Sequence, residues 1–487
     1  MPLFPRDATR PSALPARASP WNLDAPLLYL SSEDAWTTRD ACEGVQVFGG
    51  IGSGKTSGSG KALAHSFLKA GFGGLVLCSK PEERALWETY CRTAGRSSQV
   101  LIFHPHEKWR YNFIDAELRR SSAAGGGLTE NLVELLTTVT TLAEGAKGMD
   151  NGDKFWERSM KVLLPNAIEV ITLAKGRISL EDICRFVLEA PQSPEQVGDE
   201  RWRTGSYTAQ CIAEADAKPK TAREQHDCEV SIRYWLGSWP NLADRTRSSI
   251  VATWESVGDL LLHGIAHELV CTETNWLPEL SFKGAITILD LPLQRFHETG
   301  RIVQGILKYT WQRAVLARDV TQEPRPVFLW IDEAQGHISA FDYEYQSTAR
   351  SARACTVYLS QSITNYHAKL GSGAQANADA LLGLFQTTIF HANSDAATND
   401  WAAKRIGQHW TTTYNFNSGG GARNGARNNS SSGGSESVQY KILPSAFTTL
   451  RKGGPPNNLE VDAIVFQGGR IWRASGETYL KTTFKQG

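Results

Sequence analysis

Short apolar runs alternate with helix-length segments in the first and last parts of the chain. The runs that we expect to form strands are 45–48, 73–78, 99–103, 285–290, 327–331, 356–361, 387–390 and 461–466. Helical patterns separate several of them, among them 57–70 and 300–318. Strands that alternate with helices form parallel sheets whose two faces are both covered. The pattern therefore predicts an α/β fold with a mostly parallel central sheet.

The middle of the chain, residues 128–265, has a different pattern. Its apolar residues recur at helical spacing, and no strand-like run interrupts them. We predict an all-α domain here, inserted into an α/β nucleotide-binding domain made of 24–127 and 266–487. The region is rich in tryptophan, and these side chains are interpreted as core and interface aromatics, with a base-stacking platform as the alternative: Trp156, Trp202, Trp235, Trp239 and Trp254.

Two segments are expected to lie outside the packed core. Residues 1–23 contain arginines and prolines but no apolar stretch typical of a signal peptide, which predicts a flexible tail. Residues 412–437 are rich in Gly, Ser and Asn, which predicts a mobile loop. No run of about eighteen apolar residues occurs, so we expect no transmembrane segment.

Composition and charge restrict the classes of function only weakly. The 487 residues include 51 Lys+Arg and 51 Asp+Glu, so the chain has no net basic charge that would indicate nucleic-acid binding. Any such contact must come from a local patch or from a pore built by several subunits. The 8 cysteines include no C-x-x-C pair. They are typical of reduced core thiols in a cytoplasmic protein.

The clearest chemical signal is a phosphate-binding loop after the first predicted parallel strand. It reads G-x-x-x-x-G-K-T and consists of Gly49, Gly50, Ile51, Gly52, Ser53, Gly54, Lys55 and Thr56, with Ser57 directly after it. Backbone N–H groups and a helix N-terminus would hold the phosphates of ATP. Lys55 would reach the β- and γ-phosphates, and the Thr56 hydroxyl would bind Mg²⁺.

Two carboxylates complete this signal. Asp332 and Glu333 follow five apolar residues, which places them at the carboxyl end of a buried strand. Asp332 is expected to support Mg²⁺, and Glu333 is expected to activate the attacking water. Lys80 also lies at a strand end, where α/β sheets bind ligands, and it would either help to hold the nucleotide or be an ordinary solvated lysine.

Three polar residues surround the strand that follows the carboxylates. Gln361 ends that strand and is placed to sense the γ-phosphate or orient water. Arg350 and Arg353 precede it and would reach the nucleotide of a neighbouring subunit, as arginine fingers do. The alternative is that both arginines are solvated loop residues.

With these motifs in place, the sequence resembles the TraG/TraD-type coupling ATPases of conjugative type IV secretion, within the wider FtsK/HerA translocase group. The resemblance rests on the P-loop, on Asp332–Glu333, on Tyr111–Asp115 and above all on Thr348–Ser362. It implies a RecA-like fold and a ring of about six subunits, with DNA or a relaxosome-like DNA–protein complex in the pore. Counted back from Gln361, Arg350 occupies the finger position of that family, and Arg353 is the second candidate.

The chain departs from these relatives because it has no transmembrane helix where they carry N-terminal ones. We therefore expect a cytoplasmic protein that reaches the inner membrane through a separate anchored secretion subunit. Three functions stay open: a coupling motor that pumps DNA, a HerA/FtsK-like translocase in repair or defence, and a nucleotide-dependent adaptor that recruits protein cargo.

Overall fold

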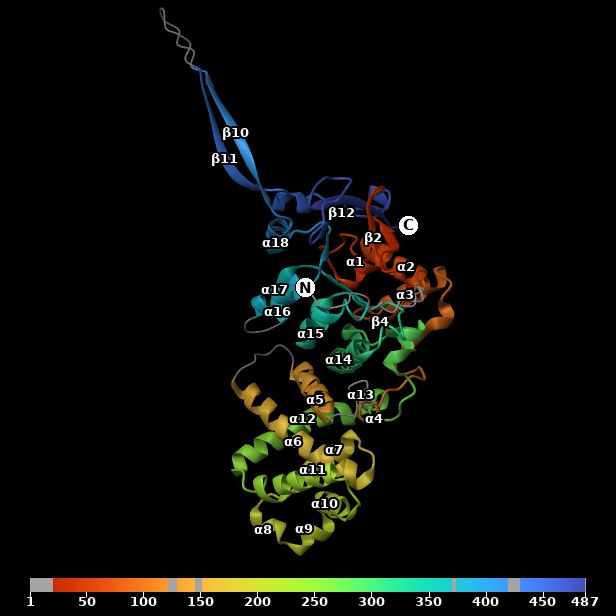
Figure 1. The fold of residues 1–487 in the computed structure, drawn as a ribbon, viewed down its shortest axis with the longest axis vertical. Coiled ribbons are helices and arrows are strands. Elements are labelled where there is room, and N and C mark those ends of the chain that lie inside the picture. The colour runs from red at the N-terminus through yellow and green to blue at the C-terminus, as the bar shows by residue number, and fades with distance from the viewer. Residues whose placement is uncertain (1–20, 121–128, 145–150, 370–373, 419–429, 487) are drawn as a thin grey trace, which may run out of the picture.

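The computed structural model describes residues 21–120, 129–144, 151–369, 374–418 and 430–486. The molecule is elongated, with a central sheet domain, a helical region at one end and a two-stranded ribbon that projects from the other end (Figure 1). Most of the predicted tail 1–23 lies outside the described residues.

The predicted α/β fold with its mostly parallel sheet is confirmed. The described part of the chain contains a nine-stranded sheet with strand order β13-β12-β9-β3-β8-β7-β4-β6-β5. Neighbours from β9 to β5 are parallel, whereas β12 is antiparallel to both β9 and β13. The strands are β3 Val45–Phe48, β4 Gly73–Leu77, β5 Val100–Phe103, β6 Ile286–Leu289, β7 Val327–Ile331, β8 Ala354–Ser360, β9 Thr387–Phe390, β12 Glu460–Gln467 and β13 Tyr479–Lys485.

The central strands are apolar along their whole length because both faces of the sheet are covered. Val45 and Val47 of β3 belong to one buried cluster, whereas Phe48 belongs to the cluster on the opposite face. The α-helices around the sheet are α1 Thr38–Cys42, α2 Lys61–Lys69, α3 Glu83–Thr93, α14 Leu293–Ala317, α15 Phe341–Thr348, α16 Ile363–Lys369, α17 Ala374–Gly383 and α18 Ala396–Ile406. Short π- or 3₁₀-turns complete this domain: η1 Thr56–Gly60, η2 Ser97–Gln99, η5 Pro278–Lys283, η6 Ala334–Gly336, η7 Pro444–Thr448 and η8 Pro455–Asn457.

The described residues between β5 and β6 contain no strand, only one isolated bridge between Tyr111 and Thr274. Their helices are α4 Phe113–Arg119, α5 Thr129–Glu144, α6 Asn151–Lys175, α7 Leu180–Leu188, α8 Pro194–Val197, α9 Glu200–Gly205, α10 Tyr207–Ala217, α11 Ala222–Arg233, η4 Tyr234–Ser238, α12 Asp244–Leu262 and α13 Gly264–Val270. Trp202, Trp235, Trp239 and Trp254 are buried here, so they are core residues and not a base-stacking platform. The Trp156 side chain lies outside the described residues.

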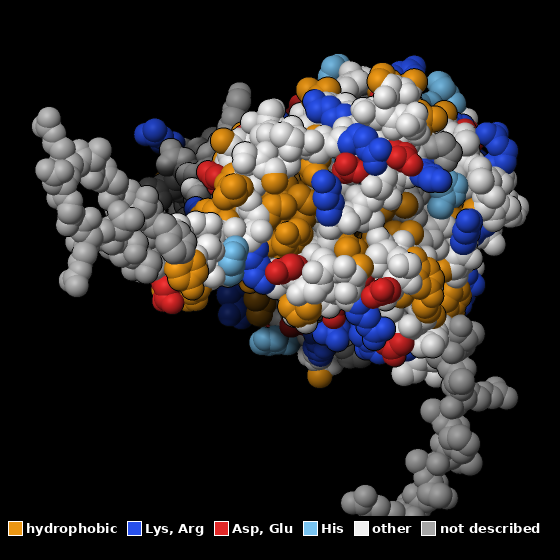
Figure 2. All heavy atoms as spheres, turned by 90° about the horizontal axis from the view of Figure 1, so that it is seen from above, with side chains coloured by type: hydrophobic (Ala, Val, Ile, Leu, Met, Phe, Trp, Pro, Cys, Tyr) orange, Lys and Arg blue, Asp and Glu red, His pale blue; other side chains and the backbone are white. Residues whose placement is uncertain are grey.

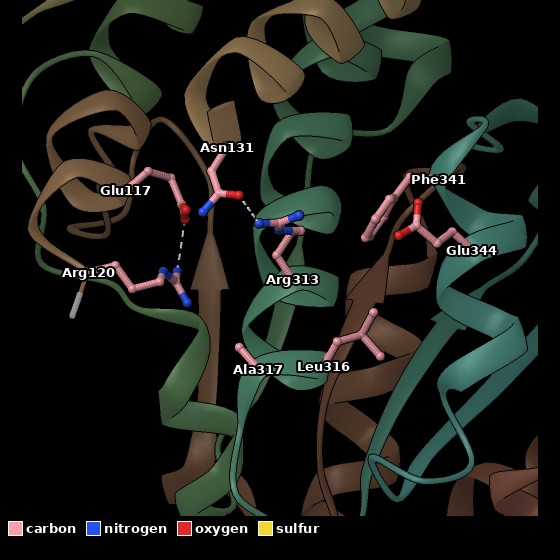
Figure 3. A pocket seen from close by; sticks show the side chains of 8 residues that line it. All are labelled: Glu117, Arg120, Asn131, Arg313, Leu316, Ala317, Phe341 and Glu344. Atoms are coloured by element: carbon pink, nitrogen blue, oxygen red, sulfur yellow. Dashed lines mark hydrogen bonds and ion pairs between the residues drawn. The ribbon is translucent and has the colours of Figure 1, made fainter. Parts of the chain in front are cut away.

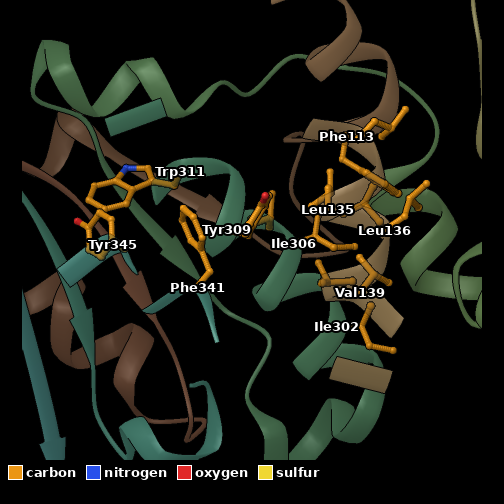
Figure 4. Packing of buried hydrophobic residues seen from close by; sticks show 14 of the residues in the cluster. Phe113, Leu135, Leu136, Val139, Ile302, Ile306, Tyr309, Trp311, Phe341 and Tyr345 are labelled. Carbon is orange, nitrogen blue, oxygen red and sulfur yellow. The ribbon is translucent and has the colours of Figure 1, made fainter. Parts of the chain in front are cut away.

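Helix α14 lies between the helical region and the sheet and contacts both. Ile302 and Ile306 of α14 pack near Leu135 and Val139 of α5, all within one buried cluster (Figure 4). Farther along α14, the ring of Tyr309 lies 4.8 Å from that of Phe341 at the start of α15. A single helix therefore contacts both the helical region and the segment that follows β7.

The junction also contains a cavity, seen in Figure 3, between α4, α5, α14 and α15. Its lining residues are Glu117, Arg120, Asn131, Arg313, Leu316, Ala317, Phe341 and Glu344. Arg120 donates to Glu117 at 2.9 Å, and Arg313 donates to Asn131. The cavity is lined by the last turn of α14, which ends at Ala317 and leads into the amino end of β7 at Val327. It therefore lies toward the amino ends of the strands, away from the P-loop.

The predicted mobile loop 412–437 is wrong for the parts that the structure describes. Strands β10 Gln408–Ser418 and β11 Ser430–Tyr440 pair antiparallel along their whole length, and they form the projecting ribbon in Figure 1. A loop was predicted from the Gly and Ser content, whereas β10 itself contains Trp410, Tyr414 and several threonines, which favour strands. The remaining low-complexity residues, 419–429, lie outside the described residues.

Three further features complete the description of the fold. A small separate sheet pairs β1 Pro26–Tyr29 with β2 Ala35–Thr37. None of the helices among the described residues combines the length and apolar character needed to cross a membrane. On the face shown in Figure 2, cationic and anionic side chains are interspersed, as the net charge of zero leads one to expect.

Candidate functional site

The P-loop connects the carboxyl end of β3 to a helical turn. Its glycines are required by the backbone: Gly52 and Gly54 have φ angles of 68° and 82°, which side chains rarely tolerate. A Cβ on Gly54 would lie 2.5 Å from Cγ2 of Val461 in β12. At Gly52 a Cβ would meet nothing within 4 Å. The loop is therefore shaped both by its own backbone and by the strand beside it.

The helix after the loop begins with one π-turn, η1, and continues as α2. The Gly60 N–H donates to the Lys55 carbonyl at 2.9 Å, a spacing of five residues. The Ser59 hydroxyl lies 2.7 Å from Nε2 of His391, a buried residue directly after β9. Burial, and to a lesser extent the charge of Lys55, lowers the pKa of His391 to about 4, so this ring is neutral at physiological pH. Single π-turns often occur at functional sites.

The structure brings Asp332 and Glu333 to the P-loop, although 276 residues separate Asp332 from Thr56. The Thr56 hydroxyl donates to Oδ2 of Asp332 at 2.8 Å. Nζ of Lys55 lies 3.8 Å from Oε1 of Glu333. Strand β7, which carries the carboxylates, is separated from β3 only by β8, and all three strands end at the same edge of the sheet.

Glu333 is held by donors on both oxygens. Gln361 donates to its Oε1 at 3.1 Å, and Gln335 donates to its Oε2 at 2.8 Å. Burial alone would raise the pKa of Glu333, but these two hydrogen bonds and the charges of Lys55 and Lys80 lower it. The backbone of Glu333 is left-handed, with φ 51° and ψ 48°. Such a conformation costs about 1–3 kcal/mol in a residue with a side chain and is often found at active sites.

Lys80 lies closer to the carboxylates than a solvated lysine would. Its ammonium group donates to Oε1 of Glu333 at 3.2 Å and lies 3.9 Å from Oδ2 of Asp332. Burial opposes the charge on Lys80, but the two carboxylates outweigh burial and raise its pKa. The described geometry thus favours the first of the two predicted interpretations, a lysine at the ligand-binding edge of the sheet.

A second layer of polar groups supports this edge. The Ser79 hydroxyl donates to the Asp332 carbonyl at 2.6 Å, and the Ser79 N–H donates to Glu83 at 2.8 Å. Burial, reinforced by the charge of Asp332, raises the pKa of Glu83 well above its ordinary value. This shift disfavours a third negative charge beside Asp332 and Glu333.

The two predicted arginines lie at the opposite edge of the sheet, before the first residue of β8. Seven residues of β8 separate the two edges, which corresponds to about 23 Å. The Arg350 side chain is 62% exposed and pairs with Glu43 at 3.3 Å. Arg353 has a left-handed backbone, and its Nη1 donates to the Pro324 carbonyl at 2.9 Å within the same chain. Neither arginine reaches the P-loop of its own chain.

Residues at the end of β13 contact the P-loop helix and were not predicted to do so. The Gln486 side chain donates to the Ser57 hydroxyl at 2.6 Å and accepts from the Gly454 N–H at 2.6 Å. Lys61 donates to the Gln486 carbonyl at 3.0 Å. Gln486 carries no motif, so the sequence gives no signal for this contact. Lys80 and Gln335, in contrast, lie beside strand ends that had been recognised.

The arrangement fits Mg²⁺ and a nucleoside triphosphate. Thr56 and Asp332 supply a hydroxyl and a carboxylate oxygen 2.8 Å apart, and Mg²⁺ takes one or two protein oxygens and completes its shell with water and phosphate. No cluster of three or more His, Cys, Asp or Glu suited to a metal occurs among the described residues. The buried Ser53 hydroxyl of the loop has no hydrogen-bond partner of its own.

Comparisons with known proteins agree with these features. Residues 326–448 match a family model described as the TraM recognition site of TraD and TraG. A search of curated proteins finds no match. Among solved structures, the unbound conjugative coupling protein TrwBdeltaN70 is 14% identical, with a TM-score of 0.58, over 92% of this chain and 86% of that chain.

Two further TrwB structures contain nucleotides. The complex with the non-hydrolysable GTP analogue GDPNP and the complex with ADP and Mg²⁺ are each 14% identical. Each has a TM-score of 0.58 and covers 93% of this chain and 88% of that chain. At this identity the likeness establishes a shared fold. The roles of individual residues rest on the geometry above.

Proposed function

Because this chain carries, at 326–448, a segment of the TraG/TraD coupling-protein family and shares the fold of TrwB, we propose that it is an ATP-hydrolysing motor of the coupling-protein type. It would recruit DNA or a DNA–protein complex and move it toward a type IV secretion system. The single observation that carries the proposal is the convergence of Thr56, Asp332 and Glu333 at one edge of the sheet.

Each group at that edge has a proposed role. The P-loop N–H groups and Lys55 bind the phosphates, while Thr56 and Asp332 hold Mg²⁺, whose charge supplies electrostatic stabilisation of the phosphates. Glu333 accepts a proton from the attacking water, and Gln361 orients that water. These are the roles that the sequence predicted, and the distances around Glu333 support them.

The arginine would come from a second copy of the chain. Arg350 is exposed and about 23 Å from the P-loop edge of its own sheet, so it is placed to act in trans. Arg353 is the weaker candidate because its guanidinium already binds the Pro324 carbonyl. We propose a ring, of six subunits by the family resemblance, in which hydrolysis needs two adjacent copies.

A partner protein follows from the matched segment. The family model that matches 326–448 is described as a recognition site for TraM, and we propose by analogy that this chain also docks a protein bound to the DNA. This observation keeps the adaptor function as a second candidate, in which nucleotide turnover controls cargo recruitment without DNA movement.

One experiment separates these functions. ATP hydrolysis is measured at low salt, with and without single- and double-stranded DNA, while light scattering gives the mass of the assembly. Low salt is chosen because electrostatic binding to DNA is strongest there. A motor requires hydrolysis that DNA stimulates and that Lys55→Ala and Glu333→Gln abolish. Hydrolysis without stimulation by either DNA favours the adaptor, and an absence of hydrolysis refutes the enzyme assignment.

A further inference from the structure

Both oxygens of the Glu333 carboxylate accept hydrogen bonds from side chains of the same chain. Oε1 accepts from Lys80 and Gln361 at 3.2 and 3.1 Å, and Oε2 accepts from Gln335 at 2.8 Å. A general base must present a free lone pair to the water that it deprotonates. Two of the three donors share Oε1, and each donor stabilises the charged carboxylate, so the loss of one donor would free a lone pair on Oε1 and make Glu333 a stronger base.

Lys80 is the donor best able to leave. Gln335 is fixed at its other end, because its Oε1 accepts from the Ser360 hydroxyl at 2.8 Å. The backbone carbonyl of Gln361 accepts from Asn393 at 2.8 Å. The Lys80 side chain is 29% exposed, and its contacts in this network are with the two carboxylates. A lysine on a flexible four-carbon stem changes partner more easily than the anchored amide of Gln335 does.

The geometry also gives Lys80 a second place to bind. Lys80 lies 3.9 Å from Oδ2 of Asp332, the oxygen that accepts from Thr56. This oxygen and Lys55 border the place that the proposed function assigns to the γ-phosphate. Lys80 and Glu333 also line a cavity next to this place, together with Gln294, Gln335 and Lys369. The cavity leaves space for the side chain of Lys80 to move.

We propose that Lys80 is a γ-phosphate-responsive residue, which pairs with Glu333 when no γ-phosphate is present and with the γ-phosphate when one is bound. The inference rests on the proposed function and adds a control step to it. In the nucleotide-free and ADP-bound states, Lys80 holds Glu333. When a γ-phosphate is bound, Lys80 moves to it, and Oε1 of Glu333 loses one of its two donors, which frees a lone pair for the attacking water.

The charges support this exchange. Lys55 and Lys80 lie beside Asp332 and Glu333, and burial raises the pKa of Glu83 well above its ordinary value, which disfavours a third negative charge here. A γ-phosphate adds negative charge that both lysines can approach. With Lys80 drawn away, Glu333 loses one of the charges that weaken it as a base.

The test compares ligands that differ in the γ-phosphate. Isothermal titration with Mg²⁺ measures the dissociation constants of ADP and of the non-hydrolysable ATP analogue AMPPNP, and their ratio reports the γ-phosphate contribution without turnover. Lys80→Met is expected to reduce the preference for AMPPNP about fivefold, the size of a partly exposed ion pair. Lys80→Gln keeps the apolar stem and a polar end, and it serves as a second variant if Lys80→Met does not fold. Lys369→Met is the matched control, because Lys369 lines the same cavity without an ion pair to Glu333, and it should leave the ratio unchanged.

A double-mutant cycle then tests for competition between the two partners. Glu333→Gln releases Lys80 and should increase the preference for AMPPNP, and this increase should be about fivefold smaller when Lys80→Met is also present. An unchanged ratio in the Lys80 variants, an equal change in Lys369→Met, or additive effects in the cycle would each overturn the inference while leaving the proposed function intact. If the unaltered protein binds neither nucleotide, the proposed function fails first and the role of Lys80 fails with it.

Discussion

Lys308 and Asp342 form an ion pair that is almost completely buried, and its removal should destabilise the fold measurably. The side chains are 1% and 0% exposed, and Lys308 also donates to the His337 carbonyl at 2.6 Å. Asp342 accepts further from the Ser339 N–H at 2.6 Å, from Gln312 at 2.9 Å and from the Tyr358 hydroxyl at 2.7 Å. Lys308→Met retains the apolar stem but leaves a buried carboxylate without its cation. This typically costs about 3–5 kcal/mol.

The neutral donors that remain around Asp342 place the expected loss at the lower end, about 3 kcal/mol. In a thermal melt followed by circular dichroism, this corresponds to a decrease in Tm of roughly 3 °C for a chain of 487 residues. The second substitution Asp342→Asn removes the charge that needs the cation and keeps one oxygen for Gln312 and Tyr358, while its amide nitrogen replaces the oxygen that accepted from Ser339. Lys308→Met with Asp342→Asn should therefore be more stable than Lys308→Met alone, even though it carries one more change.

The same pair predicts a dependence on pH. Burial would raise the pKa of Asp342, but the Lys308 charge and the hydrogen bonds outweigh burial and keep this pKa below its ordinary value. The unaltered Asp342 thus stays ionised from pH 8 to 5 and contributes no slope in that range. In Lys308→Met the folded-state pKa of Asp342 rises above its unfolded value. Protonation of Asp342 then stabilises the folded variant. The difference in Tm between the unaltered protein and Lys308→Met should therefore decrease as the pH falls from 8 to 5. A Tm difference that does not change with pH would refute this reasoning. So would a double variant whose loss of stability equals the sum of the losses in Lys308→Met and Asp342→Asn.

The remaining predictions concern the P-loop and the arginines. Lys55→Ala should abolish nucleotide binding or turnover because the phosphates lose their cation, and wild-type rates in that variant would rule out the P-loop assignment. Gly54→Ala should lower Tm and nucleotide affinity more than Gly52→Ala, because both positions have a positive φ but only the Gly54 methyl would meet Val461; equal losses would mean that the clash is relieved. Arg350→Ala should leave Tm unchanged and abolish hydrolysis, with rescue when these subunits are mixed with Lys55→Ala subunits. Arg353→Ala should instead lower stability by about 1–2 kcal/mol, because its hydrogen bond to the Pro324 carbonyl is lost. If mixing with Lys55→Ala subunits restores hydrolysis to Arg353→Ala but not to Arg350→Ala, then Arg353 is the residue that acts in trans.

The sequence predicted the site best where a local pattern also fixes a position in the sheet. Five apolar residues followed by Asp332 and Glu333, with a P-loop upstream, predict a buried strand with carboxylates at its end, and parallel pairing brings them near the strand that precedes Lys55. Gln361 was placed at this edge for the same reason, although β8 ends one residue before it. A strand end is therefore enough to place a side chain within a few ångströms.

The sequence failed where the contact depends on pairing between distant segments. Gln486 and Ser57 are 429 residues apart, and no pattern near either residue announces the antiparallel addition of β12 and β13 beyond β9. The ribbon β10–β11 was misjudged because Gly and Ser content was given more weight than the β-forming residues of β10. Arg353 could not be separated from Arg350, because the Pro324 carbonyl that binds it comes from the preceding connection.

The order of the strands explains why one chain supplies only part of the proposed site. Strands β3, β8, β7 and β4 are consecutive neighbours, and their carboxyl ends are followed by Lys55, Gln361, Asp332–Glu333 and Lys80 respectively. The phosphate-binding, metal-binding and base groups thus come from one edge of one sheet. Arg350 lies before the amino end of β8. The strand, about 23 Å long, separates it from the phosphate-binding, metal-binding and base groups of its own chain. If Arg350 is the arginine that stabilises charge on the γ-phosphate, as proposed, it would be presented by a second copy whose amino edge faces this carboxyl edge. The restraint that Lys80 places on Glu333 is then useful, because a chain that has bound no γ-phosphate holds its base inactive.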